Sequence, residues 1–298
     1  MDVIRTEQLT RSYGHRRGVE QIDVRVAGGT IFGFLGPNGA GKTTTIRLLL
    51  GFLRAGAGRA EILGYDCWRD GQRIKRDVGY VPGDMRLYPW MTARSGLSIV
   101  GRIRGCDVAT EGRTLADRFQ LEMDVAVRKM SRGTRQKLGL MLALAHRPRV
   151  LVLDEPTSGL DPLVQETLAD MLRERAAEGA TIFFSSHTLR EVEELCDRVA
   201  IIRSGRLVAN ESLDDLRRRA RRDVTLVFRD EDTAARHEPP ASLKLIKRYG
   251  RTWRGEIDGV ADRLLQWAAA RSVEDLTIGP PDLETLFRKF YRDDEASP

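Results

Sequence analysis

The sequence predicts an α/β fold in which a mostly parallel sheet is covered by helices, with a helical insertion and a small α+β domain at the C-terminus. Three observations predict it. Short β-rich runs alternate with longer helical runs through the first two thirds of the chain, no strand-like run occurs over residues 84–144, and the composition changes where a basic run precedes new strand-like segments. We therefore expect a large domain over residues 1–213, with the insertion at 84–144, and a small domain over residues 214–298.

The strands of the large domain are predicted from short apolar and β-branched runs bounded by glycine, proline or polar residues. The run Val150–Leu153 is continuously apolar, as in a strand buried on both faces, so we place it at the centre of the sheet. The other expected strands are Val3–Leu9, Gln21–Val26, Thr30–Leu35, Gly58–Ile62, Val78–Val81, Thr181–Ser185, Arg198–Arg203 and Arg206–Ala209.

The helical insertion is predicted from apolar residues that recur at helical spacing through Leu97–Ile103, Thr114–Leu121 and Leu138–Leu144. In the small domain, the Pro239-Pro240 pair interrupts the chain between regular segments. We expect strands at Val224–Phe228, Leu243–Tyr249, Thr252–Ile257 and Val273–Ile278, and helices at Ala261–Ala270 and Asp282–Tyr291.

Composition excludes several classes of protein. Of the 298 residues, 41% are hydrophobic and 31% charged, which excludes a wholly disordered chain. The longest stretch without a charged side chain, Val26–Gly41, is shorter than the roughly 20 apolar residues of a membrane span and is rich in glycine. The N-terminus lacks the apolar run of a secretory signal, so we expect a cytoplasmic protein. The three cysteines are widely spaced, which argues against a disulfide framework or a zinc site.

The net charge of +6 comes from 49 basic and 43 acidic residues, and much of the excess lies in the run Arg217–Arg222. Such a run is more typical of a solvated helix face than of a nucleic-acid site. No nucleic-acid partner is therefore expected.

A phosphate-binding loop is predicted between the apolar run Ile31–Leu35 and the helix-like segment Thr44–Leu50. The pattern GxxxxGK[ST] is matched by Gly36, Pro37, Asn38, Gly39, Ala40, Gly41, Lys42 and Thr43. Glycines let backbone N–H groups turn towards phosphate oxygens, and the following helix N-terminus adds the positive end of its dipole. Lys42 would contact the β- and γ-phosphates, and the Thr43 hydroxyl would bind Mg²⁺.

Two carboxylates follow the most apolar strand, where the crevice of an open α/β sheet lies. Asp154 would help to hold Mg²⁺, and Glu155 would orient or deprotonate an attacking water. Acidic residues also end strands and cap helices for structural reasons, but their combination with the phosphate loop favours a catalytic role.

With these motifs, the chain resembles the nucleotide-binding subunit of an ATP-binding-cassette (ABC) transporter over about Val3–Asn210, which implies a P-loop NTPase core. The segment Ser131–Lys137 resembles the family's signature motif, and Ser158–Asp161 resembles the dimer-contacting loop. His187 falls at the position of the switch histidine, and Tyr13 at that of the aromatic residue that stacks on adenine.

The resemblance implies a homodimer of ATPase subunits that hydrolyses ATP with Mg²⁺ and drives a transmembrane permease from the inner face of the cell membrane. Thr44 would add a backbone contact to the phosphates, and Ser131 and Gly133 would face the γ-phosphate of ATP held by the second subunit. From the residues alone, Ser131 could equally be a helix N-cap, His187 a surface residue and Tyr13 a core residue. The tail Pro281–Phe287 resembles that of ATPases paired with ABC-2-type exporters of drugs, antibiotics or lipids.

The chain departs from the family at two positions. Gly83 replaces the glutamine that senses Mg²⁺ and contacts the membrane partner, so either Asp84 or water substitutes for it or coupling to that partner is altered. Arg132 replaces the first glycine of the signature motif. The apolar segment Leu87–Met91 falls in the groove that receives a coupling helix of the permease, although it could also pack inside the helical insertion. The alternative functions are a nonhydrolytic, ATP-switched regulatory or resistance protein, which could bind RNA, and an importer ATPase.

Overall fold

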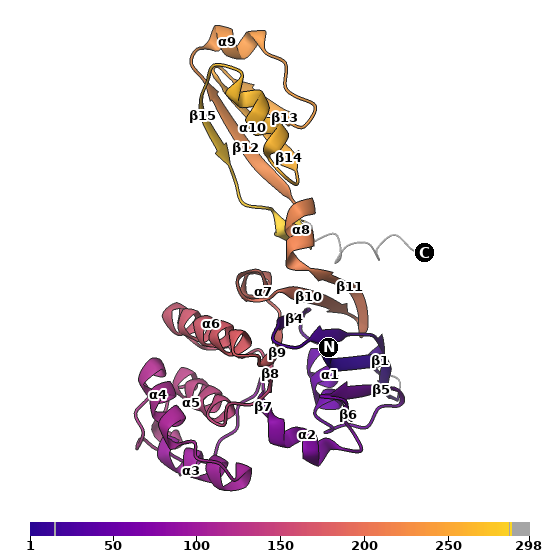
Figure 1. Cartoon of the computed structure of the whole chain (residues 1–298), viewed down its shortest axis with the longest axis vertical. Helices are drawn as coiled ribbons and strands as arrows, with labels where there is room; N and C mark the ends of the chain where they lie inside the picture. Colours follow the sequence, from indigo (N-terminus) through magenta and orange to yellow (C-terminus); the bar gives the residue numbers. More distant parts are fainter. Residues whose placement is uncertain (15, 286, 288–298) are drawn as a thin grey trace. The chain divides into compact units, whose positions relative to one another are not determined.

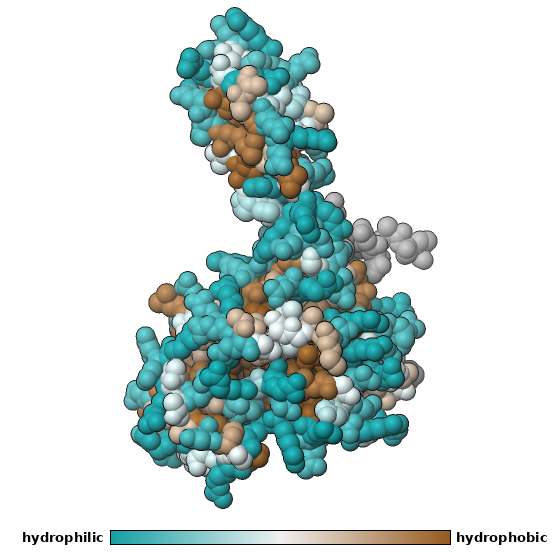
Figure 2. Space-filling model, in the orientation of Figure 1, coloured by the Kyte–Doolittle hydropathy of each residue, from teal (hydrophilic) through white to brown (hydrophobic). Residues whose placement is uncertain are grey.

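A computed structural model describes residues 1–14, 16–285 and 287. The chain forms two compact units, Met1–Asn210 and Glu211–Pro298, each with elements of its own (Figure 1). The visible surface is mostly hydrophilic, with scattered apolar patches (Figure 2). None of the helices in the described part of the chain has the length and apolar character of a membrane span.

The first unit is built around a six-stranded sheet in the order β11-β10-β4-β9-β8-β7. Four neighbouring pairs are parallel, as the alternating pattern predicts: β10 with β4, β4 with β9, β9 with β8, and β8 with β7. The bounds are Ile31–Leu35 (β4), Val78–Val81 (β7), Val150–Asp154 (β8), Thr181–Ser186 (β9), Arg198–Arg203 (β10) and Arg206–Ser212 (β11).

Every residue of β4, β8 and β9 is buried, so these strands are covered on both faces. The prediction that Val150–Leu153 is buried on both faces is confirmed, but its placement at the centre of the sheet is wrong, because β8 lies between β9 and the edge strand β7. Parallel strands bring their carboxyl ends to one edge of the sheet. The segments that follow β4, β7, β8 and β9 therefore start at the same edge.

A second, antiparallel sheet has the order β2-β1-β5-β6, with β3 paired to β1. The expectation of one continuous strand over Gln21–Val26 is wrong. Gln21 has a φ of 52°, and Asp23 leaves the ladder to accept a hydrogen bond from the backbone of Gln8, so the chain bends between two strands. The bounds are Asp2–Tyr13 (β1), Arg16–Ile22 (β2), Arg25–Ala27 (β3), Ala57–Ile62 (β5) and Tyr65–Asp66 (β6).

Helices cover the parallel sheet and form the insertion. Between β7 and β8, residues 82–149 are all described and contain no strand, only α3, α4, α5 and a short 3-10 helix. The sequence did not predict α2, α6 or α7. The helices are Lys42–Leu49 (α1), Gly71–Asp77 (α2), Ala93–Arg104 (α3), Ala109–Phe119 (α4), Arg132–Leu144 (α5), Pro162–Ala177 (α6) and Leu189–Leu195 (α7).

The second unit contains a four-stranded antiparallel sheet in the order β13-β14-β12-β15, and it has a βαββαβ sequence after α8. The four strands predicted there are confirmed, and the predicted helix Asp282–Tyr291 falls largely outside the described residues. The elements are Leu213–Arg219 (α8), Arg221–Phe228 (β12), Glu231–Arg236 (α9), Lys244–Tyr249 (β13), Thr252–Asp258 (β14), Asp262–Ala269 (α10) and Val273–Ile278 (β15).

An aromatic core closes the second unit. The ring of Phe228 on β12 packs edge-on against Trp253 on β14 at 4.8 Å and against Trp267 on α10 at 6.4 Å. The basic run divides between two elements, since its first three arginines end α8 and the last two begin β12. Within α8, Arg218 pairs with Asp215 at 2.5 Å, as expected for a solvated helix face.

Candidate nucleotide-binding site

The loop between β4 and α1 depends on its glycines. A Cβ on Gly36 would lie 2.4 Å from the carbonyl oxygen of Ile202 on β10, so only glycine fits there. Gly41 has a φ of 114° and occupies the N-cap position of α1 without a side-chain cap. The N–H groups of the first helical turn and the positive end of the helix dipole therefore face the loop, as an anion site requires.

Lys42 is folded back into this loop and is only 5% exposed. Its ammonium donates hydrogen bonds to the carbonyl oxygens of Gly36 at 2.7 Å and Pro37 at 3.2 Å. The Nζ atom also lies 3.1 Å from Oε1 of Glu155. A buried cation needs such partners, and the same donor can turn to phosphate oxygens.

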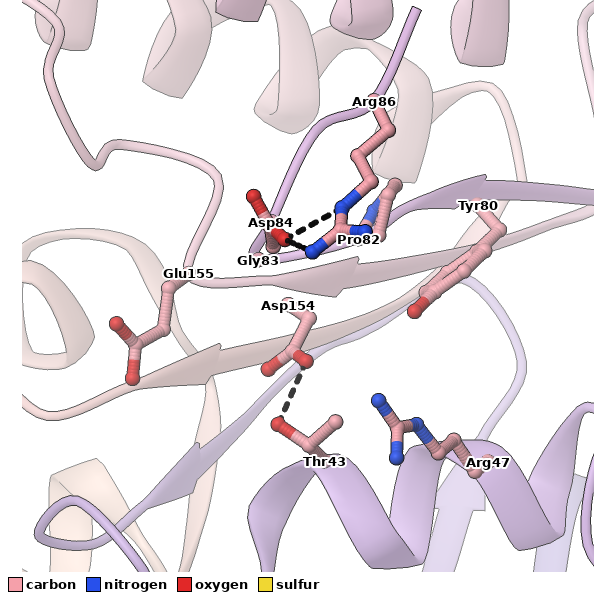
Figure 3. Close-up of a pocket in the computed structure, with 9 residues that line it drawn as sticks. All are labelled: Thr43, Arg47, Tyr80, Pro82, Gly83, Asp84, Arg86, Asp154 and Glu155. Atoms are coloured by element: carbon pink, nitrogen blue, oxygen red, sulfur yellow. Dashed lines mark hydrogen bonds and ion pairs between the residues drawn. The ribbon is translucent and has the colours of Figure 1, made fainter.

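Thr43 and Asp154 point towards each other in Figure 3, with the hydroxyl donating to Oδ2 of the carboxylate at 2.8 Å. The Ser185 hydroxyl on β9 donates to the other carboxylate oxygen, Oδ1, at 2.7 Å. Asp154 is 2% exposed, so its orientation is fixed by these two bonds. The nearby Tyr80 hydroxyl has a pKa raised to about 12, first by burial and then by the charge of Asp154.

Glu155 follows the end of β8 with a φ of 48°, in the left-handed region that non-glycine residues rarely adopt. Its backbone N–H donates to the Ser185 carbonyl at 3.1 Å. The carboxylate lies between two nitrogen groups, with Oε1 facing Lys42 and Oε2 3.3 Å from Nδ1 of the half-exposed His187. The three residues predicted as catalytic, Lys42, Glu155 and His187, are therefore neighbours.

A cleft of about 630 Å³ opens beside these groups (Figure 3). At Gly83 a Cβ would lie 3.6 Å from Oδ2 of Asp154, so the glycine borders the carboxylate and no side chain covers it from this position. The Asp84 carboxylate lines the same cleft and accepts a 2.8 Å hydrogen bond from Nε of Arg86. The lining residues are Thr43, Arg47, Tyr80, Pro82, Gly83, Asp84, Arg86, Asp154 and Glu155.

The signature-like segment lies beside the loop that follows Glu155. Ser131 is the N-cap of α5 and accepts a hydrogen bond from the Thr134 backbone at 3.1 Å. The Arg132 guanidinium donates to the Ser158 hydroxyl at 2.9 Å, and a Cβ on Gly133 would lie 2.7 Å from the Gly159 carbonyl oxygen. Within the described residues, no hydrogen bond or ion pair joins Ser131 or Gly133 to the phosphate loop of their own chain.

Tyr13 ends β1 and is 41% exposed. Gly18 lies between its ring and the phosphate loop, because a Cβ on Gly18 would be 3.0 Å from the ring, and a Cβ on Gly41 would be 3.1 Å from the Gly18 carbonyl oxygen. The Arg11 guanidinium is 5.5 Å from the ring centroid. The aromatic face is thus available near the loop rather than packed in the core.

Two buried polar residues at the site were not predicted from the sequence. Ser185 holds Asp154, and Gln136, which is 5% exposed on α5, donates from Nε2 to the Pro156 carbonyl at 2.9 Å. A polar side chain on the apolar side of a helix or at the end of an apolar strand is the signal that could have found them, because a buried polar group requires a partner.

The donor set at Thr43 and Asp154 suits Mg²⁺, which prefers oxygen ligands and is commonly held by one or two protein groups together with substrate phosphates. In the described part of the chain, no group of three or more His, Cys, Asp or Glu side chains is arranged to hold a metal. A Mg²⁺ ion here would therefore depend on phosphate oxygens as well as on the protein.

Known proteins are similar to this chain in both sequence and architecture. Residues 19–158 match the family model described as ABC transporter. The bacitracin transport ATP-binding protein BcrA of Bacillus licheniformis is 38% identical over 78% of this chain and 77% of its own length. The daunorubicin resistance ATP-binding protein DrrA3 of Streptomyces coeruleorubidus is 34% identical over 98% of this chain and 96% of its own.

Among solved structures, an ATP-binding subunit of an ABC transporter superposes with a TM-score of 0.68 at 30% identity, over 72% of this chain and 92% of that one. The fold predicted from the resemblance, an ABC-type P-loop NTPase core, is confirmed. The chain belongs to the ABC transporter family, as one of its ATP-binding and ATP-hydrolysing proteins.

Proposed function

We propose that this chain is the ATPase subunit of an ABC-2-type exporter and that it drives a separately encoded permease. One observation carries the ATPase part: Lys42, Thr43, Asp154, Glu155 and His187 form a connected set at one edge of the parallel sheet. Such a set provides a lysine to bind phosphates, two oxygen groups to bind Mg²⁺ and a carboxylate to act as a base. These are the parts that phosphoryl transfer to water requires.

In the proposed complex, the phosphate loop surrounds the triphosphate of ATP. Lys42 binds the β- and γ-phosphates, and its ammonium exchanges the loop carbonyls for phosphate oxygens. Tyr13 stacks on adenine from its exposed position near the loop. Backbone N–H groups supply the remaining contacts, from Gly36, Pro37, Asn38, Gly39, Ala40, Gly41 and Thr44.

We assign the metal site to Thr43 and Asp154. A Mg²⁺ ion held by these two side chains would neutralise charge on the phosphates. Asp154 is held for this role by Ser185, which leaves the carboxylate little freedom to reorient.

Glu155 is the proposed general base that orients and deprotonates water. Its carboxylate is 3.1 Å from the Lys42 ammonium, so γ-phosphate binding to Lys42 competes with this ion pair. Once Lys42 turns to phosphate, the Glu155 carboxylate is released from this ion pair and can turn towards a water molecule. His187 is within 3.3 Å of the same carboxylate and would hydrogen-bond the γ-phosphate.

The active assembly is proposed to be a homodimer with two ATP molecules at its interface. Ser131 and Gly133 are exposed or half-buried and have no polar link to their own phosphate loop within the described residues. They are therefore free to face the γ-phosphate of ATP held by a second copy, with the amide dipoles at the start of α5 directed towards it. The Arg132 guanidinium donates a hydrogen bond to the Ser158 hydroxyl, so its charge lies against the loop of its own chain.

The names of the relatives, which refer to bacitracin transport and daunorubicin resistance, support export as the process. The rings of Tyr88 and Trp90 stack at 5.6 Å and remain 64% and 56% exposed. We propose that they anchor a permease helix, because exposed aromatic pairs suit helix-in-groove docking. The protein would then lie at the inner face of the cell membrane, bound through its permease.

The first test is Mg²⁺-dependent ATP turnover by the purified chain, alone and with its permease, for wild type, Glu155→Gln and Lys42→Ala. Glu155→Gln should lower turnover by roughly 10²- to 10⁴-fold with ATP binding retained. Lys42→Ala should lose ATP binding. Size-exclusion chromatography with ATP should show a dimer that Glu155→Gln stabilises.

Wild-type turnover by Glu155→Gln would contradict its role as the base. Tight ATP binding with no turnover, even with the permease present, would favour the nonhydrolytic switch instead. Export of a labelled compound from vesicles, abolished by Glu155→Gln, would support the exporter assignment, and uptake would contradict it.

A further inference from the structure

We infer that Glu191 on α7 is a positioning residue for hydrolysis, because its carboxylate ties the loop of His187 to the segment that follows Glu155. This inference rests on the proposed roles of Glu155 and His187. Glu191 itself lies outside the motifs that suggest the site. Within the described residues, it forms no hydrogen bond with the phosphate loop or with Thr43 and Asp154.

The carboxylate of Glu191 uses both oxygens. Oε1 accepts a hydrogen bond from the Thr157 hydroxyl at 2.8 Å, and Oε2 accepts one from the Ser186 hydroxyl at 2.5 Å. Thr157 comes two residues after Glu155, and Ser186 directly precedes His187. Each arm of the carboxylate therefore ends one or two residues from a proposed catalytic group.

Ser186 extends this link to the far side of His187. Its side chain is 1% exposed, and its oxygen also accepts a hydrogen bond from the Thr188 N–H at 2.8 Å. The peptide on both sides of the imidazole is thus fixed to one hydroxyl. That hydroxyl is fixed in turn to Glu191.

The result is a closed ring of contacts. On one side His187 Nδ1 lies 3.3 Å from Glu155 Oε2, and on the other side Glu191 joins Ser186 to Thr157. When a γ-phosphate draws His187 away from Glu155, the first contact is lost but the second remains. Glu191 then keeps the two loops at a fixed spacing, and hydrolysis depends strongly on such spacing.

A carboxylate fits this position better than an amide. Thr157 and Ser186 both donate to it, and an ionised carboxylate only accepts, with two oxygens. Hydrogen bonds to a charged acceptor are also about twice as strong as those between neutral groups. A glutamine would satisfy one hydroxyl with its oxygen and would force the other to accept from its NH₂ group.

The test measures MgATP turnover and ATP affinity of the full-length chain for Glu191→Ala and Glu191→Gln. The matched control is Glu194→Ala, which removes another carboxylate from α7. Within the described residues, that carboxylate pairs with exposed Arg190 at 2.7 Å. Each variant is also made in the His187→Ala background. Thermal unfolding shows whether α7 remains folded.

We expect Glu191→Ala to lower kcat by about 10- to 100-fold with the Kd for ATP changed less than about twofold, since the loss is one of spacing. Glu191→Gln should recover part of kcat, and Glu194→Ala should equal wild type. In the His187→Ala background, Glu191→Ala should cause little further loss, because both act on the same loop. Wild-type kcat in Glu191→Ala, or losses that multiply with His187→Ala, would overturn the inference.

If Glu191→Ala does not fold, Thr157→Val combined with Ser186→Ala removes both arms of the link and leaves Glu191 in place. A kcat loss with retained ATP affinity supports the inference, and wild-type kcat overturns it. The proposed function fails separately, namely when Glu155→Gln and His187→Ala themselves retain wild-type turnover.

Discussion

The Thr43 hydroxyl donates a 2.8 Å hydrogen bond to Asp154, a residue 111 positions further along the chain. The first residue opens the helix after β4 and the second ends β8, so the parallel sheet itself brings them together. The pair is held from a third strand by Ser185 on β9. The packing of the sheet therefore holds together the two oxygen groups that we propose as Mg²⁺ ligands.

The first prediction concerns this pair. Thr43→Ala should raise the Mg²⁺ concentration for half-maximal ATP turnover by about 10- to 100-fold, because one oxygen ligand and the bond that orients Asp154 are both lost. Thr43→Ser keeps the hydroxyl and is the matched control. Turnover is measured across a Mg²⁺ titration, and equal midpoints for the two variants would exclude Thr43 from the metal site.

The second prediction compares two glycines. Gly83→Gln should change the free energy of unfolding by less than about 0.5 kcal/mol, because its Cβ would meet Asp154 only at ordinary contact distance and its side chain would enter the cleft. Gly36→Ala should cost about 1–3 kcal/mol, since its Cβ would lie 2.4 Å from the Ile202 carbonyl oxygen. Urea denaturation measures both, and a reversed order would contradict the packing described.

The third prediction concerns pH. Burial, with the charge of Arg104, lowers the pKa of His146 from 6.5 to about 4, although a backbone contact with Val78 and the charge of Asp77 oppose the shift. The unfolded chain therefore binds this proton more readily than the folded chain. The free energy of unfolding should fall as the pH drops from about 6.5 towards 4, by up to about 2 kcal/mol by pH 4.5 for this group.

His146→Phe removes the titrating ring and keeps a planar side chain. The unfolding free energy of wild type minus that of His146→Phe should be smaller at pH 4.5 than at pH 7.5. Nearby Asp77 opposes the shift and is unchanged in the comparison. A difference that does not vary with pH would show that His146 titrates alike in both states.

The fourth prediction concerns the thiols. Cys67 and Cys196 are buried, and burial raises the pKa of both thiols, so neither forms a thiolate readily in the folded chain. Cys106 is exposed. A thiol reagent should modify one cysteine quickly in the native protein and all three after denaturation. Rapid modification of Cys67 or Cys196 in native protein would contradict the burial.

The sequence predicted the buried strands of the parallel sheet well because their signal is local: a strand covered on both faces, such as Val150–Leu153, needs apolar side chains at every position. The same logic failed for α6, whose sixteen residues bury only Leu168, Met171 and Leu172 and so show little periodicity. The break after Gln21 was also missed, because its left-handed backbone carries no glycine or proline signal.

The residues of the candidate site also fall into two groups, those predicted from the sequence and those that were not. The phosphate loop and the carboxylate pair were found because each is a contiguous motif at the end of an apolar run. Ser185, Gln136 and Glu191 were missed because their roles come from neighbours on other elements, 31, 20 and 34 positions away. Motifs thus indicate the reacting groups, whereas only the fold shows what orients them.

The apolar cluster of the second unit draws on residues 224–278 alone, with Phe228 and Trp253 at its centre. Within the described residues, every side chain of that cluster comes from the second unit, which thus has an apolar core of its own. Substitutions on the outer surface of the βαββαβ unit are therefore expected to leave its fold intact.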